Sequence, residues 1–175
     1  MAGGPPDALE TSPLTPNTTP YGGFFVLGAL CRHGQARLAE DYMRRYWAPM
    51  LQDPNGTLWE HFERSAGSSS HAWSAAPTYY LSTEVLGVQL GYPAPGGLEP
   101  ITISPRAESL SWARGVVPHP RGDIGVDWRA DDQVLHLGVR AAPGLRYRVI
   151  PRGRLGALRL ELNGRMVERL PAEGP

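Results

Sequence analysis

The chain has 175 residues, which is enough for one ordinary domain or two small ones. Its 17 acidic and 17 basic residues give a formal net charge of zero, which argues against nucleic-acid binding because such proteins usually carry a basic excess. The only cysteine, Cys31, excludes an internal disulfide, and no apolar run approaches the ~18 residues of a membrane helix.

The first half of the chain has the periodicity of helices. Residues 1–20 are rich in Pro, Thr and Gly and are expected to form a flexible arm. Apolar residues at helical spacing then predict a helix from about Tyr21 until Gly34, where a glycine ends it. A second helix is predicted over residues 35–50, with most of its charged residues off one apolar stripe: Leu38, Tyr42, Tyr46 and Trp47.

A long irregular connection, DPNGTLWEHFERSAGSSS, precedes a third helical stretch over residues 71–90. Ser70 is a plausible cap for it. Pro77 lacks a backbone donor, which predicts a break after the first turn. These helices carry more large aromatic side chains than three helices can hide, so we expect an exposed aromatic face.

Beyond residue 98 the pattern becomes alternating, as in half-buried strands. The strands are predicted within ITISP, DIGVDW, VLHLGV, LRYRVIP and LRLELNGRMV, the last with the hairpin signal Asn163-Gly164. Such spacing predicts an antiparallel β-sandwich with Trp128 in its core. The fold class is therefore α+β, with helices over residues 21–95 and the sandwich over residues 96–172.

A set of motifs carries a family resemblance. TPYGGFFVLGAL, GTLWE, SHAWSAAPTYYLSTEVLGV, GGLEPITISPR, RGDIGVDW and VLHLGVRAAPG follow one another in this order. Together they resemble the C-terminal end of the bacterial α-L-rhamnosidases, glycoside hydrolase family 78, over roughly residues 18–151. The resemblance implies that the helices are the last ones of an (α/α)6 six-hairpin barrel and that a small β-sandwich follows.

The resemblance also implies a function. The family hydrolyses terminal α-L-rhamnose from glycosides with inversion, and Glu60 matches its general base in T-x-W-E. His71 matches a histidine of the sugar pocket. The segment between these two residues is shorter than in many members of the family. The family's general acid lies on a part of the barrel that this chain does not contain.

Each candidate also has a plainer interpretation. Glu60 could be an ordinary surface carboxylate, and His71 could instead bond a backbone carbonyl at a helix start. Trp59 and Trp73 could be core residues or the apolar wall for a sugar, with Trp73 the stronger candidate for the wall. Glu63 is expected to be solvated, because on a turn of helix it would lie on the same side of a sugar as Glu60. The histidines show no metal-ligand spacing, so neither a metal nor a cofactor is expected.

Three functions compete at this point. The chain is a fragment of an inverting α-L-rhamnosidase that carries the base without the acid, or a subunit of a split enzyme whose missing N-terminal part is a separate chain. The alternative is a non-enzymatic carbohydrate- or protein-binding β-sandwich module with a helical docking region. The expected partner is a rhamnose-containing glycoside, with no nucleic acid or membrane. We expect a cytoplasmic location because no charged-then-apolar leader opens the chain.

Overall fold

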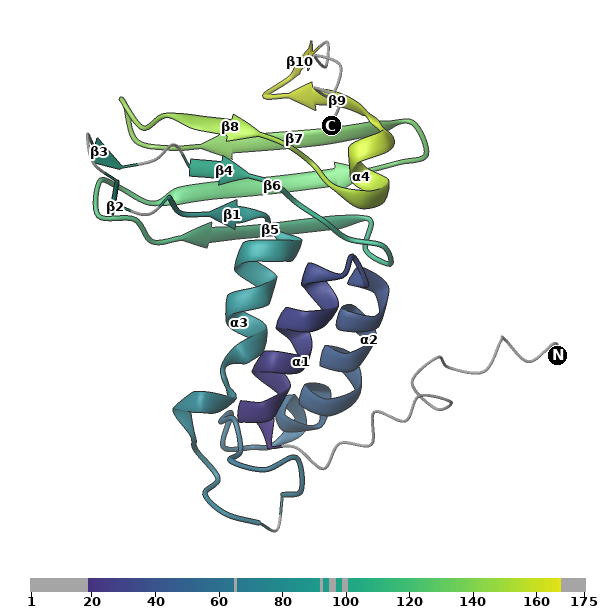
Figure 1. The fold of residues 1–175 in the computed structure, drawn as a ribbon, viewed down its shortest axis with the longest axis vertical. Helices are drawn as coiled ribbons and strands as arrows, with labels where there is room; N and C mark the ends of the chain where they lie inside the picture. Colours follow the sequence, from purple (N-terminus) through teal and green to yellow (C-terminus); the bar gives the residue numbers. More distant parts are fainter. Residues whose placement is uncertain (1–18, 65, 92, 95–96, 99–100, 168–175) are drawn as a thin grey trace, which may run out of the picture. The chain divides into compact units, whose positions relative to one another are not determined.

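A computed structural model describes residues 19–64, 66–91, 93–94, 97–98 and 101–167 (Figure 1). The predicted N-terminal arm lies outside these residues, apart from Thr19 and Pro20. The chain divides into two compact units between Tyr80 and Leu81. The sequence places the change of unit later, near residue 95, where the helical pattern ends. The structure divides earlier because the turn that ends at Val85 already packs in the sheet core.

Two consecutive helices, α1 and α2, open the first unit. Helix α1 spans Pro20–Arg32, and the Thr19 hydroxyl accepts a hydrogen bond from the Gly22 amide at its start. Pro20 occupies the first turn, where a missing amide proton costs nothing. Gly34 has a φ of 73° and follows the helix, as a glycine stop should. Helix α2 spans Ala36–Trp47 and continues as a 3-10 turn, Ala48–Gln52.

The predicted stripe on α2 faces the core of this unit. Tyr42 and Trp47 are buried, while Leu38 and Tyr46 are partly buried against them. Glu40, which was expected mostly off the stripe, is instead buried, with Arg44 4.0 Å away. The rest of the core comes from α1 and from the chain that follows α2: Leu27, Cys31, Met50, Trp59, Ala76 and Tyr80.

The third helical stretch is more broken than its sequence pattern predicts. It consists of a 3-10 turn, Ala72–Ser74, helix α3 over Ala76–Tyr80, and a π-helical turn, Leu81–Val85. The break before Pro77 is as predicted. The prediction of Ser70 as a cap is wrong, since the turn begins after His71 and has no side-chain cap.

The end of the predicted third helix is a strand. Strand β1 spans Val88–Gln89 and pairs antiparallel with β4 (Ile101–Ile103). Gly87, with a φ of 86°, ends the helical turn. Val88 and Gln89 form a strand rather than the end of a helix, because Val88 is β-branched and is buried in the sheet core.

The second unit is a β-sandwich. Its larger sheet has the order β10-β9-β7-β6-β5, and its smaller sheet has the order β1-β4-β8 (Figure 1). The remaining strands of these sheets are β5 (Trp112–Val117), β6 (Ile124–Ala130), β7 (Val134–Arg140), β8 (Tyr147–Val149), β9 (Arg159–Leu162) and β10 (Arg165–Val167). Strands β2 (Pro93–Ala94) and β3 (Gly97–Leu98) pair antiparallel, and helix α4 spans Gly153–Ala157.

Most strand pairs are antiparallel, as predicted, but two are parallel. Strand β4 pairs parallel with β8, and β7 pairs parallel with β9. The chain passes from β7 to β9 through β8 and helix α4, and a long connection of this kind is what parallel pairing requires. The predicted hairpin at Asn163-Gly164 is confirmed, with φ values of 49° and 79° at its two turn residues.

Alternation along the strands builds the sandwich core. On β6, Ile124, Val126 and Trp128 are buried, whereas Arg129 is exposed. The prediction of Trp128 in the core is confirmed, and its indole N–H donates to the Val85 carbonyl at 3.0 Å. The described helices include none that is both long and apolar enough to cross a membrane.

Candidate functional site

The residues predicted for the site lie on the connection between Asp53 and Ser74, which folds back on itself. The His71 amide donates to the Leu58 carbonyl at 2.8 Å, and the Glu60 amide donates to the Ser68 carbonyl at 2.9 Å. Residues 57–60 therefore run beside residues 68–71. This closure brings Glu60 near His71 although eleven positions separate them in the chain.

Glu60 is held by groups from both sides of the loop. Its Oε2 accepts the Ser68 amide at 2.8 Å and lies 3.7 Å from His71 Nδ1. Its Oε1 lies 3.9 Å from His61 Nε2. The side chain is 25% exposed, so the carboxylate is partly sheltered but still open to solvent. A carboxylate held beside two imidazoles is a group that can accept a proton from water.

Gly67 makes this approach possible. It has a φ of 67°, and a Cβ atom at this position would lie 2.6 Å from Glu60 Oε2. Sequence reasoning missed Gly67, Ser68 and His61 as neighbours of Glu60. The glycine before three serines was a visible turn signal, but it did not indicate which side chain the turn would approach.

His71 and Trp73 form one surface next to the carboxylate. Their ring centroids are 4.0 Å apart, and the Trp73 indole N–H lies 3.4 Å from the Glu60 carbonyl oxygen, to which it donates. Trp73 is 42% exposed and also contacts Tyr21 of α1 at 5.4 Å between centroids. The structure thus brings Glu60, His71 and Trp73 together.

Trp59 is buried and is not part of the surface that His71 and Trp73 form. The residue is 7% exposed and packs in the helical core, so it offers little surface to a ligand. Its indole N–H donates to Asp53 Oδ2 at 3.0 Å, and the Arg64 guanidinium stacks 5.5 Å from its ring centroid while Arg64 Nε pairs with the same Asp53 oxygen. The bond from the Asn55 amide, followed by the bond from Arg64, lowers the pKa of the Asp53 carboxyl below its ordinary value.

Glu63 is exposed, and the segment around it is irregular rather than helical. The helical spacing assumed for Glu60 and Glu63 is therefore absent. Among the residues that the structure describes, no group of three or more His, Cys, Asp or Glu side chains is placed to hold a metal ion.

An exposed aromatic face adjoins the site, as predicted. Tyr21, Phe24 and Phe25 on α1 are 37–58% exposed, and Tyr79 on α3 is 52% exposed. The rings contact one another in sequence, with centroid separations of 5.3 Å for Tyr21–Phe25 and 5.7 Å for Phe24–Tyr79. Water-exposed aromatic surface of this kind usually has a partner.

Together these features define an α+β chain in which a helical unit carries a sheltered carboxylate and a separate unit forms a β-sandwich. Residues 87–163 match the family model of the bacterial alpha-L-rhamnosidase C-terminal domain. This match confirms the resemblance over the sandwich, which is thus a rhamnosidase-related module. The match covers less than half of the chain and leaves Glu60 and His71 outside it. No curated protein matches the chain with significance.

Proposed function

We propose that this chain is the C-terminal part or a subunit of an inverting α-L-rhamnosidase, with Glu60 as its general base. The observation that carries the proposal is the convergence of Glu60, His71 and Trp73 on one loop, in which Glu60 Oε2 lies 3.7 Å from His71 Nδ1. The family match of the sandwich supports the assignment to rhamnosidases.

In the proposed reaction, Glu60 takes a proton from a water molecule as that water attacks the anomeric carbon of a terminal rhamnose. The bond from that carbon to the glycosidic oxygen breaks at the same time, and a general acid protonates the leaving oxygen. The bond from the Ser68 amide fixes the orientation of the carboxylate, and His71 lies beside it. The half-exposed ring of Trp73 provides an apolar wall for the methyl and C–H face of the sugar. Trp59 acts from the core side, where it anchors the loop through Asp53.

An inverting enzyme also needs a general acid on the opposite face of the bond, ~6.5–9.5 Å from the base, which leaves room for the water. The described contacts of the Glu60 carboxylate are with two histidines and a backbone amide, and none is with a second carboxylate. We therefore propose that the acid comes from the N-terminal part of the enzyme, either on the same polypeptide or as a separate chain. The exposed aromatic face on α1 and α3 is where such a segment would pack.

The test is hydrolysis of a chromogenic aryl α-L-rhamnoside by the chain alone and by the chain mixed with a candidate N-terminal part. We expect no turnover from the chain alone and turnover from the mixture, with β-rhamnose as the first product by NMR. Glu60→Gln should lower the rate of the mixture by roughly 10²–10⁴-fold. The matched control is Glu63→Gln, which removes an exposed carboxylate from the same loop and should leave the rate unchanged.

Full activity of Glu60→Gln in the reconstituted enzyme would contradict the assignment of the base. Retention of the anomeric configuration would contradict inversion. If no N-terminal part restores turnover, the non-enzymatic binding module becomes the better description of this chain.

A further inference from the structure

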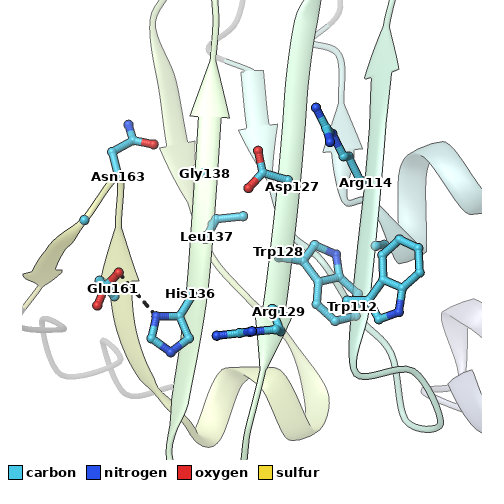
Figure 2. A pocket seen from close by; sticks show the side chains of 12 residues that line it. Trp112, Arg114, Asp127, Trp128, Arg129, His136, Leu137, Gly138, Glu161 and Asn163 are labelled. Atoms are coloured by element: carbon cyan, nitrogen blue, oxygen red, sulfur yellow. Dashed lines mark ion pairs between the residues drawn. The ribbon is translucent and has the colours of Figure 1, made fainter.

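The outward face of the larger sheet carries a groove that is distinct from the Glu60 loop. It encloses about 470 Å³ and runs across strands β5, β6, β7 and β9 (Figure 2). Binding sites for small molecules typically have volumes of roughly 300–1,000 Å³, so the groove can hold a few sugar units. Its polar and aromatic lining consists of Trp112, Arg114, Asp127, Arg129, His136 and Glu161.

Strand register places these side chains in rows across the sheet. Trp112 is opposite Arg129, Arg129 is opposite His136, and His136 is opposite Glu161. Because side chains alternate between faces, this row points away from the core that contains Val126 and Trp128. A second row, next to the first, consists of Arg114, Asp127 and Gly138.

Gly138 keeps the floor of the groove open. A Cβ atom at this position would lie 2.8 Å from Asp127 Oδ1. Any side chain there would displace the carboxylate and fill the space between the two rows. Packing of the core does not require a glycine here, because this position faces outward and is half-buried.

The acidic groups of the groove already have side-chain partners. His136 Nδ1 lies 3.2 Å from Glu161 Oε1, the pair marked in Figure 2, and Arg140 donates to Asp127 at 3.1 Å. In the part of the chain that the structure describes, no hydrogen bond or ion pair engages the guanidinium groups of Arg114 and Arg129. Two exposed cations thus remain available in the groove.

The aromatic group is Trp112, which is 65% exposed at the β5 end of the first row. An exposed indole gains little for folding, but it offers a flat apolar surface on which the C–H face of a sugar ring can stack. Planar side chains that donate and accept hydrogen bonds, such as those of Arg129, Asp127 and His136, are suited to hydroxyl groups in several directions. A protein partner is the less favoured occupant, because Asp and Glu, which line this groove as Asp127 and Glu161, are depleted at protein interfaces.

We propose that this groove binds an acidic oligosaccharide, with one sugar ring stacked on Trp112 and a sugar carboxylate paired with Arg129 or Arg114. Arginine forms short, charge-assisted hydrogen bonds with carboxylates, and its fork geometry favours bidentate contact. The proposal is independent of the catalytic role of Glu60, which lies in the other compact unit.

The experiment measures binding of two probes to the full chain by titration calorimetry. The probes are tetragalacturonate and the neutral galactotetraose of the same linkage. We expect the acidic probe to bind about tenfold more tightly or better, because hydrogen bonds to charged groups are the stronger ones. Added salt should reduce this preference, since the sites are exposed.

Variants then locate the site. Trp112→Ala should abolish detectable binding of both probes, and Arg129→Gln or Arg114→Gln should remove most of the preference for the acidic one. Arg165→Gln is the matched control, because Arg165 is an exposed arginine on β10 outside the groove. Gly138→Val should block binding by filling the groove. Thermal unfolding of each variant checks that it is folded. Trp112→Ala should unfold at nearly the same temperature as the unmodified chain, because Trp112 is mostly exposed.

Several results would overturn the proposal. These are no binding of either probe, equal affinity for the acidic and neutral probes, or an equal loss of affinity in Arg165→Gln and Arg129→Gln. NMR shift changes confined to the Glu60 loop would also overturn it. Glu60→Gln should bind both probes as the unmodified chain does, so failure at the groove is distinguishable from failure of the proposed catalytic site.

Discussion

The indole N–H of Trp59 donates to the Asp53 carboxylate at 3.0 Å, and the Asn55 amide donates to the other carboxylate oxygen at 2.8 Å. Arg64 pairs with the same oxygen as Trp59. Asp53 therefore joins the start of the long connection to a core tryptophan and to a residue beyond Glu60. Its role is to hold the loop in place rather than to exchange protons with a substrate.

The first prediction concerns Asp53→Asn, which should lower the midpoint of thermal unfolding at neutral pH by a few degrees. The folded-state pKa of Asp53 is lowered, chiefly by the Asn55 amide and then by Arg64. The stability that this carboxylate contributes is therefore complete above its unfolded-state pKa of about 3.9 and is lost as the pH falls through the lower folded-state value. The difference between the variant and the unmodified chain should shrink below about pH 4.

The measurement is the unfolding midpoint by circular dichroism as a function of pH. Glu63→Gln is the control, because Glu63 is exposed on the same loop. A difference between Asp53→Asn and the unmodified chain that stays constant down to the lowest pH would show that the Asp53 charge does not hold the loop.

The second prediction concerns the contact between α1 and α3. The Tyr80 hydroxyl donates to the Phe24 carbonyl at 2.9 Å, and a Cβ atom on Gly28 would lie 2.8 Å from this hydroxyl oxygen. Gly28→Ala should destabilise the helical unit although alanine favours a helix by roughly 1 kcal/mol. In a Tyr80→Phe background the same change should be tolerated better, by about 1 kcal/mol.

This double-mutant cycle is read from chemical denaturation of the four proteins. Equal effects of Gly28→Ala in both backgrounds would show that the hydroxyl does not set the spacing between α1 and α3.

The third prediction concerns the sandwich core. Trp128→Phe removes the indole N–H that donates to the Val85 carbonyl and leaves a cavity in a site that is 2% exposed. We expect a loss of about 2–3 kcal/mol in the free energy of unfolding. Trp112→Phe is a matched change at a position that is 65% exposed, and it should alter stability by no more than about 0.5 kcal/mol. Similar losses in the two variants would contradict the assignment of Trp128 to the core.

The fourth prediction compares two glycines with positive φ values. Gly164, with a φ of 79°, has no neighbouring atom within 4 Å of an added Cβ, so Gly164→Ala should cost only the backbone strain of about 1–2 kcal/mol. Gly87 has a φ of 86°, but its Cβ would lie 2.2 Å from the Pro105 nitrogen. Gly87→Ala should therefore be far more damaging and should prevent folding of the sandwich. Comparable unfolding midpoints for the two variants would rule out close packing of Gly87 on Pro105.

Much of the local structure followed from the sequence alone. The helical stripe with Tyr42 and Trp47, the alternation of β6, and the hairpin at Asn163-Gly164 each depend on residues close together in the chain. Strand β5 escaped prediction because its pattern is inverted. Its outward residues include Trp112 and Arg114, while its inward residues include Gly115, which sits against Leu86. Small residues on the inner face give no apolar alternation to detect.

The sequence by itself determined the change from helices to strands and the family resemblance of the sandwich. The change depends on the periodicity of apolar residues, and the resemblance depends on short motifs. Only the tertiary structure decided which of the marked residues meet. The approach of Glu60 to His71 depends on a loop that closes at Gly67, and the burial of Trp59 depends on the helical core in which it packs. The groove depends on the register of strands that pair across the sheet, and a periodic pattern reveals which face is apolar but not which strand lies beside it.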